Sequence, residues 1–515
     1  MKRPIAGLRL TASAASDAPT FMTAKCIMVL GTTSGAGKSW LTTALCRHYA
    51  RQGLKVAPFK AQNMSNNARV VASDKGSGEI GSAQYFQALA ARSVPDVRMN
   101  PLLLKPEADT HSQVVLMGQV SSALTAMPWR SRSNHVWPHI TAALDELRFE
   151  NDVVVIEGAG SPAEINLSGS DIVNMRVAGH CHAACLLVTD IDRGGAFAHL
   201  YGTWALLPES ERALIKGFVL NKFRGDAALL APAPQMLQDL TRIATVATLP
   251  MWWQHGLPEE DGVFDDKSTV SGAVKLTVAV IAYPRISNLD EFQPLKNIPG
   301  LRLMWVRSPA ELAGLSAKDW VVLPGSKATS SDMAWLRAQG LDAAVAAHAG
   351  RGGAVLGICG GLQMLGEALI DPQGGDGDAP GLGLLPLVTV FELDKTVRHT
   401  QATFADGIAA PWHALAGVTV SGYEIHQGIT QPQSTLATAG EVARAVLPGG
   451  LAWQNAAGNV LGLYLHGLFE DPGALQALFG AQLNGTVPTL DVVFDRLADF
   501  IELHFQPGVL PGLLA

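Results

Sequence analysis

Residues 31–39, GTTSGAGKS, have the composition of a loop that binds phosphate. Glycines permit a tight turn in which backbone N–H groups converge on phosphate oxygens, Lys38 adds a cation, and the Ser39 hydroxyl can hold Mg²⁺. Thr32 stands where the common pattern has its first glycine. The expected phosphate-binding residues are Gly31, Thr32, Thr33, Ser34, Gly35, Gly37, Lys38 and Ser39. A strand-like segment before the loop and a helical one after it favour this role over an ordinary turn.

A second chemical group is Cys359, which lies in the glycine-rich elbow GICGG at residues 357–361. A bend between a strand and a helix exposes such a thiol at a helix N-terminus, a setting that favours nucleophilic cysteine. His466 also follows a strand-like segment, and the carboxyl ends of parallel strands bring distant residues together. Each residue alone is as readily structural, but the pair predicts a nucleophile and its base. Gly325 and Gly360 are placed to donate backbone N–H groups to an oxyanion.

Acidic side chains follow two buried strand-like segments of the first half. Glu157 precedes a glycine-rich turn, and Asp190 and Asp192 follow the next such segment. Carboxylates at the carboxyl ends of strands can hold Mg²⁺ together with a loop hydroxyl such as that of Ser39. We expect Ser39, Glu157 and Asp190 to be the metal ligands. Turn or cap residues are the alternative for each acid alone.

Residues 60–67, KAQNMSNN, are rich in amides directly after a strand-like segment. Lys60, Gln62, Asn63 and Asn66 are therefore candidates to hold the carboxylates or carboxamides of a substrate. A loop held by its own hydrogen bonds is the alternative, and the amides alone do not decide between the two.

The elements that position these residues are short apolar runs that alternate with helical stretches. This alternation predicts an α/β fold with parallel sheets covered by helices. A helix is expected at 39–52, and the acidic, turn-rich segment 255–272 is the best linker candidate. The expected strands are 26–30, 54–57, 153–156, 184–188, 218–220 and 245–249, then 276–281, 303–306, 321–323, 354–358 and 460–464.

Composition restricts the class of protein. With 515 residues, 48% of them hydrophobic and 16% charged, the chain is folded and has two domains. We expect a disordered extension at 1–24, domains at 25–254 and 275–515, and a linker at 255–274. A net charge of −7 argues against broad nucleic-acid binding.

The cysteine count and the apolar runs bear on location. Five cysteines without a CxxC pattern argue against a disulfide framework and for a reducing cytoplasm. No uninterrupted apolar run has the length of a membrane span. Arg9 interrupts what would be the apolar part of a signal peptide, and Met22 is an alternative start.

The chain resembles the cobyric acid synthase family, the glutamine-dependent amidases of adenosylcobalamin biosynthesis, from Cys26 to about Leu503. Twelve blocks occur in the family's order. They are GTTSGAGKS, PFKAQNMSNN, EIGSAQ, NPLLLKP, SQVVLMG, EGAGSPAEINL, DIDRGGAFA, NKFRGD, LPGSKAT, GICGGLQMLG, GYEIHQG and YLHGLF. The resemblance implies a P-loop domain similar to dethiobiotin synthetase, followed by a class I, triad-type glutamine amidotransferase domain.

The resemblance also implies a reaction. ATP and Mg²⁺ would activate the b, d, e and g propionates of adenosylcobyrinic acid a,c-diamide as acyl phosphates, and ammonia from L-glutamine would capture them. Cys359 and His466 would hydrolyse the glutamine, and Asn221 with Lys222 would recognise the adenine ring. The two sites are expected to face each other across the domain interface. The oligomeric state stays open.

Two departures from the family pattern stand out. Gly35 occupies a position where many members have asparagine, which loosens the turn. Leu468 replaces the acid that class I amidotransferases carry two residues after the histidine, so Glu470 and Glu424 are candidates to orient His466.

Two other functions remain as alternatives. Cobyrinic acid a,c-diamide synthase shares both domains, but KAQNMSNN and NPLLLKP favour the first assignment. A ParA-like ATPase switch without catalysis is the other, and the presence of both Cys359 and His466 weighs against it.

Overall fold

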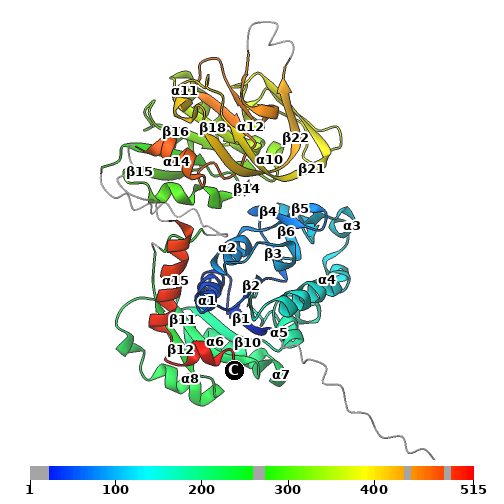
Figure 1. Ribbon diagram of the computed structural model, residues 1–515, viewed down its shortest axis with the longest axis vertical. Coiled ribbons are helices and arrows are strands. Elements are labelled where there is room, and N and C mark those ends of the chain that lie inside the picture. The colour runs from blue at the N-terminus through cyan, green and yellow to red at the C-terminus, as the bar shows by residue number, and fades with distance from the viewer. Residues whose placement is uncertain (1–22, 254, 259–272, 434–441, 481–488) are drawn as a thin grey trace, which may run out of the picture.

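The computed structural model describes residues 23–253, 255–258, 273–433, 442–480 and 489–515. They form two α/β domains, which lie one above the other in Figure 1. The expected extension at 1–24 lies outside the described residues except for its last two, and most of the expected linker at 255–274 lies outside them too. Within the described part, no helix is long and apolar enough to cross a membrane.

The first domain is built on a parallel sheet of six strands. In spatial order they are β12 (Thr245–Pro250), β11 (Ile215–Phe223), β10 (Ala184–Asp190), β1 (Lys25–Gly31), β9 (Val153–Glu157) and β2 (Val56–Phe59). Alternate residues of a strand point to opposite faces, so β1 contributes to two cores. Ile27 and Val29 pack in the core that includes α1 (Lys38–Arg51), whereas Met28 and Leu30 pack in the core that includes α4 (Trp129–Glu150).

Other helices of this domain complete the two layers. They are α2 (Ser82–Ala90), α3 (Ser122–Thr125), α5 (Met175–Cys181), α6 (Ala196–Leu206), α7 (Glu209–Arg212) and α8 (Ala233–Thr241). The sequence correctly predicts a parallel α/β domain and the positions of its strands, although β2 begins two residues after the expected start at 54.

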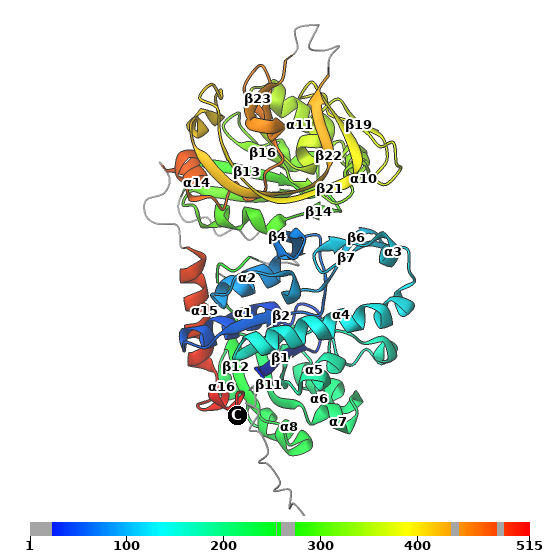
Figure 2. The same ribbon diagram turned by 45° about the vertical axis from the view of Figure 1, so that its right-hand side comes forward.

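Two small sheets lie above the main sheet, on the side of the second domain (Figures 1 and 2). One contains β3 (Gln62–Met64), β6 (Leu102–Ala108), β7 (His111–Leu116) and β8 (Gln119–Val120). The other is a hairpin of β4 (Ala68–Ser73) and β5 (Gly76–Gly81). These strands are not among the sequence predictions, because the segment carries amides and glycines rather than long apolar runs.

The second domain also has a sheet with a parallel centre. Its order is β15 (Leu301–Val306), β13 (Leu276–Ile281), β16 (Trp320–Leu323), β18 (Ala354–Ile358), β25 (Val460–Leu463), β24 (Ala452–Gln454) and β23 (Arg444–Leu447). The last two strands pair antiparallel. The five strands expected from sequence all form and are parallel, which confirms the predicted fold class.

Smaller elements surround this sheet. The strands are β14 (Ile286–Ser287) and β17 (Gly325–Ser326), which pair with each other, and β19 (Ala368–Ile370), β20 (Ala379–Pro380), β21 (Leu387–Thr403) and β22 (Thr419–Pro432). The helices are η4 (Leu289–Asn297), α9 (Pro309–Leu312), α10 (Thr329–Ala338), α11 (Leu341–Gly350), α12 (Gly360–Leu365) and α14 (Pro472–Phe479). The long β21–β22 hairpin lies next to β4 of the first domain.

The C-terminal segment returns to the first domain. Helix α15 (Leu490–His504) runs beside α1 in both views, and α16 (Val509–Gly512) follows it (Figures 1 and 2). Phe494 and Leu497 pack in the core that holds α1, and Arg47 pairs with Asp491 and Asp495 at 2.6 and 2.8 Å. Residues 490–515 fall within the expected second domain, 275–515, whereas α15 packs on α1 of the first.

Candidate active sites

The predicted phosphate loop joins the end of β1 to the start of α1. Gly37 has a φ of +98°, and a Cβ there would lie 2.0 Å from the side-chain nitrogen of Asn221. A Cβ at Gly31 would lie 3.0 Å from Lys38 Nζ. The two glycines therefore permit a close approach that a larger residue would block, and Gly31 does so although it stands one position before the usual glycine.

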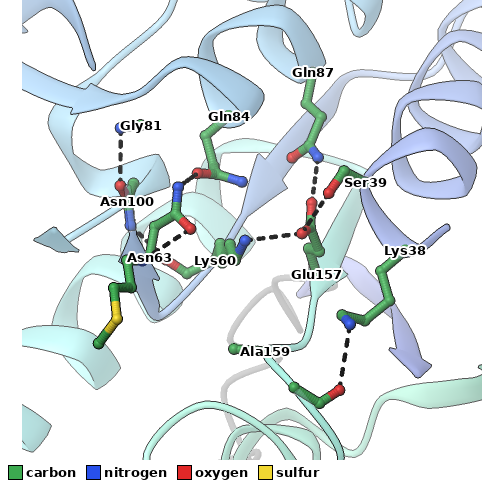
Figure 3. Close-up of polar contacts among 12 residues, drawn as sticks. Lys38, Ser39, Lys60, Asn63, Gly81, Gln84, Gln87, Asn100, Glu157 and Ala159 are labelled. Carbon is green, nitrogen blue, oxygen red and sulfur yellow. Dashed lines mark hydrogen bonds and ion pairs between the residues drawn. The ribbon is translucent and has the colours of Figure 1, made fainter. Parts of the chain in front are cut away.

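Lys38 extends back across the loop. Its Nζ donates to the backbone carbonyl of Thr33 at 3.1 Å and to that of Gly160 at 3.2 Å, as Figure 3 shows for the second contact. Thr32 is buried and its hydroxyl donates to Thr189 on β10, whereas Ser34 is exposed. The loop is thus anchored at its start and open at its tip, and it carries a lysine that lies inside the turn.

Two residues of β11 hold the loop from the side. Asn221 Nδ2 donates to the carbonyl of Ala36 at 2.9 Å, and Lys222 Nζ donates to the carbonyl of Gly35 at 2.8 Å. Lys222 also pairs with Asp190 at 3.1 Å. The structure therefore brings Asn221, Lys222 and Asp190 to the phosphate loop. Their contact with an adenine ring remains a prediction.

Glu157 ends β9 and is the most densely bonded carboxylate near the loop. One oxygen accepts hydrogen bonds from Ser39 Oγ and Lys60 Nζ, both at 2.8 Å, and the other accepts from Gln87 Nε2 at 2.6 Å (Figure 3). Its side chain is 1% exposed. Burial raises the pKa of Glu157, but Lys60 and the hydrogen bonds from Gln87 and Ser39 outweigh burial and hold it below its usual value.

The donor set fits a magnesium ion. Ser39 Oγ and Glu157 supply a hydroxyl and a carboxylate oxygen within 2.8 Å of each other, and Mg²⁺ takes oxygen ligands while keeping waters and phosphate oxygens in its shell. Asp190 pairs with Arg193 at 3.3 Å, and Asp192 pairs with another arginine. In the described part of the chain, Asp190 forms no hydrogen bond with Ser39 or Glu157, and no three acidic, histidine or cysteine side chains cluster as metal ligands.

The amide-rich segment begins beside this carboxylate and leads away from it. After Lys60, Gln62 and Asn63 lie on β3, and Asn63 donates to Gln84 of α2 at 3.2 Å (Figure 3). Gln62 Oε1 and Gln84 Nε2 are buried and have no hydrogen-bond partner among the described residues. Asn66 lies further along and donates to a carbonyl of β6. Lys60 is thus brought to Glu157 beside the phosphate loop, Gln62 and Asn63 lie on the strand that follows, and Asn66 lies further along.

Cys359 occupies a sharp bend between β18 and α12. Its φ is +53°, a conformation that non-glycine residues rarely adopt, and its backbone N–H donates to Leu463 of β25 at 2.8 Å. A Cβ at Gly361 would lie 1.9 Å from the carbonyl of Leu323, so the elbow cannot form with a larger residue there. This strained elbow resembles those that present a nucleophile at the end of a strand.

His466 lies between the cysteine and a carboxylate. Cys359 lies close enough to raise the pKa of His466, while Cys359 Sγ donates to the carbonyl of Ile425 at 3.5 Å. His466 Nδ1 lies 3.3 Å from Glu291 Oε1. The other oxygen of Glu291 accepts from the backbone N–H of Gly467 at 3.1 Å. The imidazole stacks on Tyr423 with ring centroids 5.3 Å apart and an interplanar angle of 16°. The structure therefore contains a cysteine, histidine and glutamate in the order of a catalytic triad.

Electrostatics favour a charged imidazole at this site. Burial lowers the pKa of His466, but the Glu291 carboxylate and the neighbouring Cys359 outweigh burial and raise it to about 10. A neighbouring imidazolium generally favours the thiolate, which is the nucleophilic form of cysteine. The group can then donate its proton to a leaving amine.

The orienting acid differs from both residues that the sequence suggested. Glu470 pairs with Arg69, and Glu424 pairs with Arg398 and His426. Neither contacts the imidazole in the described part of the chain. Glu291 lies on η4, which precedes His466 by most of the domain, so sequence spacing could not identify it. The available signal was an acidic pair between the apolar residues of NLDEF, soon after a predicted strand.

The two predicted oxyanion glycines also lie at this bend. A Cβ at Gly325 would lie 3.1 Å from His466 Cε1, and one at Gly360 would lie 2.8 Å from the backbone nitrogen of Ser326. Both close approaches exclude side chains. Gly325 therefore packs against His466, and Gly360 directly follows Cys359; their N–H groups as oxyanion donors stay a prediction.

Comparison with known proteins gives the same division of the chain. The family model described as CobQ/CobB/MinD/ParA nucleotide binding domain matches residues 27–251, and the model described as CobB/CobQ-like glutamine amidotransferase domain matches residues 277–474. The phosphate loop with Glu157 falls in the first match, and the Cys359 site falls in the second.

Curated relatives match over both domains. The cobyric acid synthase of Albidiferax ferrireducens is 96% identical over 493 residues, which cover 96% of this chain and all 100% of that protein. That of Polaromonas naphthalenivorans is 76% identical, with the same coverage of each chain. That of Leptothrix cholodnii is 62% identical and covers 96% of this chain and 97% of its own.

Proposed function

This chain belongs to the cobyric acid synthase family, and from that premise we propose that it converts adenosylcobyrinic acid a,c-diamide to adenosylcobyric acid. The reaction amidates the b, d, e and g propionates with ATP and L-glutamine. The main support is that one chain contains two clusters of reactive residues. The first comprises Lys38, Ser39 and Glu157. The second comprises Cys359, His466 and Glu291. Either cluster alone supports only nucleotide binding or amide hydrolysis.

The first domain activates the carboxylate. A propionate oxygen attacks the γ-phosphorus of ATP, the bond to the β-phosphate oxygen breaks, and ADP leaves. Lys38 stabilises the negative charge on the phosphates, and the backbone of the loop from Gly31 to Ser39 cradles them. Mg²⁺, held by Ser39 and Glu157, would neutralise further phosphate charge.

The corrinoid side chains meet polar residues beside this cluster. Lys60 Nζ lies 2.8 Å from Glu157, so its charge is next to the point of phosphoryl transfer. The unpartnered oxygen of Gln62 and the amide of Asn63 lie on the adjoining strand. These groups are suited to hold a propionate and its already amidated neighbours, which supports the substrate class without fixing a pose.

The second domain supplies ammonia. The Cys359 thiolate attacks the glutamine side-chain carbonyl, and N–H groups of Gly325 and Gly360 stabilise the oxyanion. His466 donates its proton to the leaving nitrogen, which departs as ammonia and leaves a thioester. Water, activated by the now neutral His466, hydrolyses the thioester to glutamate and regenerates Cys359. Glu291 keeps the imidazole oriented through both steps.

The acyl phosphate must react with ammonia before water hydrolyses it. The domains contact each other through apolar and charged side chains, and Val70 of the first domain shares a buried cluster with Tyr423 and Ile425 of the second. Such an interface limits the access of bulk water to the acyl phosphate.

We place the reaction in the cytoplasm, because all five cysteines lie in the described part of the chain as free thiols.

Mass spectrometry of corrinoid products tests the proposal. Purified enzyme would be incubated with ATP, Mg²⁺, glutamine and either cobyrinic acid a,c-diamide or unamidated cobyrinic acid, both in adenosylated form. We expect the diamide to gain one amide for each of the b, d, e and g positions. Amidation confined to the a and c acetates of cobyrinic acid would assign the chain to the sister reaction, and ATP hydrolysis without any amide would contradict both.

A further inference from the structure

Arg69 is a buried arginine of the first domain whose side chain enters the second. It lies on β4 and is 2% exposed. Its Nη1 and Nη2 donate to the two carboxylate oxygens of Glu470 at 2.8 and 2.6 Å, and Nη2 also pairs with Asp290. Both carboxylates belong to the amidotransferase domain. The Arg69 side chain is buried and that of Glu470 is 27% exposed. A bidentate contact between a guanidinium and a carboxylate is among the most directional ion pairs in proteins.

The two carboxylates flank the members of the triad. Asp290 is the neighbour of Glu291 on η4. Glu470 belongs to the turn that follows His466, where its N–H donates to the carbonyl of Gly467 at 2.9 Å. Arg69 therefore joins the segment that carries the triad acid to the segment that carries the triad histidine.

A second connection passes through an aromatic ring. The Arg69 guanidinium carbon lies 5.1 Å from the ring centroid of Tyr423, and this is the ring that stacks on His466. The Tyr423 hydroxyl accepts from Asn288 Nδ2 at 2.7 Å, and the same nitrogen donates to the carbonyl of Ala68 at 3.1 Å. β4 thus contacts the triad region through both its backbone and its arginine.

The positive charge of Arg69 offsets repulsion among the carboxylates around it. Burial raises the pKa of Glu470, Arg69 lowers it, and Asp290 and Glu291 raise it further. Three carboxylates therefore repel one another in a buried volume that the guanidinium neutralises in part. Without that charge, repulsion would move Glu291 or force one of its neighbours to take up a proton.

On the basis of the proposed function, we propose that Arg69 is a positioning residue that the ATP-binding domain supplies to the glutaminase site. It acts through Asp290 and Glu470 to hold Glu291 against His466. The segment that carries it begins at Lys60 beside Glu157, so a single short stretch of chain links the two active sites. Glutamine hydrolysis then depends on docking of the two domains.

Arg69→Met in the full chain tests this role by steady-state glutamine hydrolysis and by ammonia-supported amide synthesis. We expect kcat for hydrolysis to fall by up to about 100-fold, because displacement of a catalytic group by about 1 Å has effects of this size. KM for glutamine should stay near wild type, since the ion pairs of Arg69 are with Glu470 and Asp290 and not with Cys359 or His466. Ammonia-supported synthesis should stay close to wild type, which also shows that the variant is folded.

Two further variants separate positioning from a general role in packing. Asp290→Asn in the Arg69→Met background removes one repelling charge, so kcat for hydrolysis should recover in part. Arg285→Met is the matched control, because Arg285 also spans the interface, to Asp109 at 2.7 Å, without contacting Asp290 or Glu470. That control should hydrolyse glutamine normally.

Three results would overturn the inference. They are an unchanged kcat for hydrolysis in Arg69→Met, a parallel loss of hydrolysis and ammonia-supported synthesis, and a double variant that is worse than the single one. If ammonia failed to support amide synthesis even in the wild-type chain, the proposed function would be at fault. A hydrolysis defect in Arg69→Met would still report on positioning in that case.

Discussion

Glu291 Oε1 lies 3.3 Å from Nδ1 of His466, although the two residues are 175 positions apart in the chain. Leu468 stands where class I amidotransferases carry the acid of the triad, so the position after the histidine cannot supply it. Instead, η4, which lies near the start of the domain's sequence, supplies the carboxylate of Glu291. The triad is therefore complete in space while its usual sequence pattern is broken.

Glu291→Gln should lower kcat for glutamine hydrolysis on the order of 100-fold, because the amide cannot stabilise an imidazolium. In the wild type, the carboxylate helps to raise the pKa of His466 to about 10, so the imidazolium persists up to that pH. Without the carboxylate this pKa falls, and the alkaline limb of the kcat profile should move to lower pH. Glu424→Gln, which removes a carboxylate paired with Arg398, is the control and should leave that limb in place.

Cys359→Ala should abolish glutamine-supported amide synthesis and keep synthesis with ammonium salts. The reason is that the thiolate acts only on glutamine, whereas the carboxylate is activated in the other domain. Rates with the two nitrogen sources, measured side by side in one preparation, check the prediction. Normal turnover with glutamine in this variant would show that another residue is the nucleophile.

Lys38→Ala should reduce amide synthesis from either nitrogen source by on the order of 100-fold or more, because the phosphates lose a preorganised cation. Glutamine hydrolysis should survive, since Cys359 and His466 are untouched. Amide formation from ammonia and glutamate release from glutamine are the two measurements. Wild-type synthesis with ammonia in this variant would exclude the loop as the ATP site.

Phe494→Ala should destabilise the first domain, although the residue lies near the end of the chain. Phe494 is 1% exposed and packs in the core that contains α1. Truncation of a buried phenylalanine costs about 3–5 kcal/mol of unfolding free energy. Thermal or denaturant unfolding followed together with ammonia-supported synthesis checks this, and the exposed substitution Leu503→Ala on the same helix is the control. Equal stability of the two variants would contradict the packing of α15 on α1.

Short sequence patterns were sufficient to predict most strands of the two main sheets and part of each candidate active site. The phosphate loop and the Cys359 elbow are contiguous, and their glycines meet close backbone approaches, as at Gly37 and Gly361. His466 was found because it follows a buried strand. Spacing and composition of this kind report on local geometry, and they locate a strand end without showing what faces it.

The residues that sequence reasoning missed all act over long distances in the chain. Glu291 meets His466 only after the second domain has folded, and Arg69 reaches the histidine region only after the two domains have docked. α15 reads as an ordinary amphipathic helix, and nothing in its pattern tells which domain it covers. It packs on α1 through buried Phe494 and Leu497, and Arg47 of α1 pairs with Asp491 and Asp495. Tertiary contacts decide such cases, so a single sequence leaves them open.

The central claim is that ammonia made at Cys359 is used at the ATP site of the same chain. The direct measurement is mass spectrometry of the corrinoid formed from amide-¹⁵N glutamine with unlabelled ammonium present. We predict one ¹⁵N atom for each new amide, with little dilution by the ammonium. Cys359→Ala should give the same product without label. Unlabelled product from the wild type, or no new amide at all, would contradict the account.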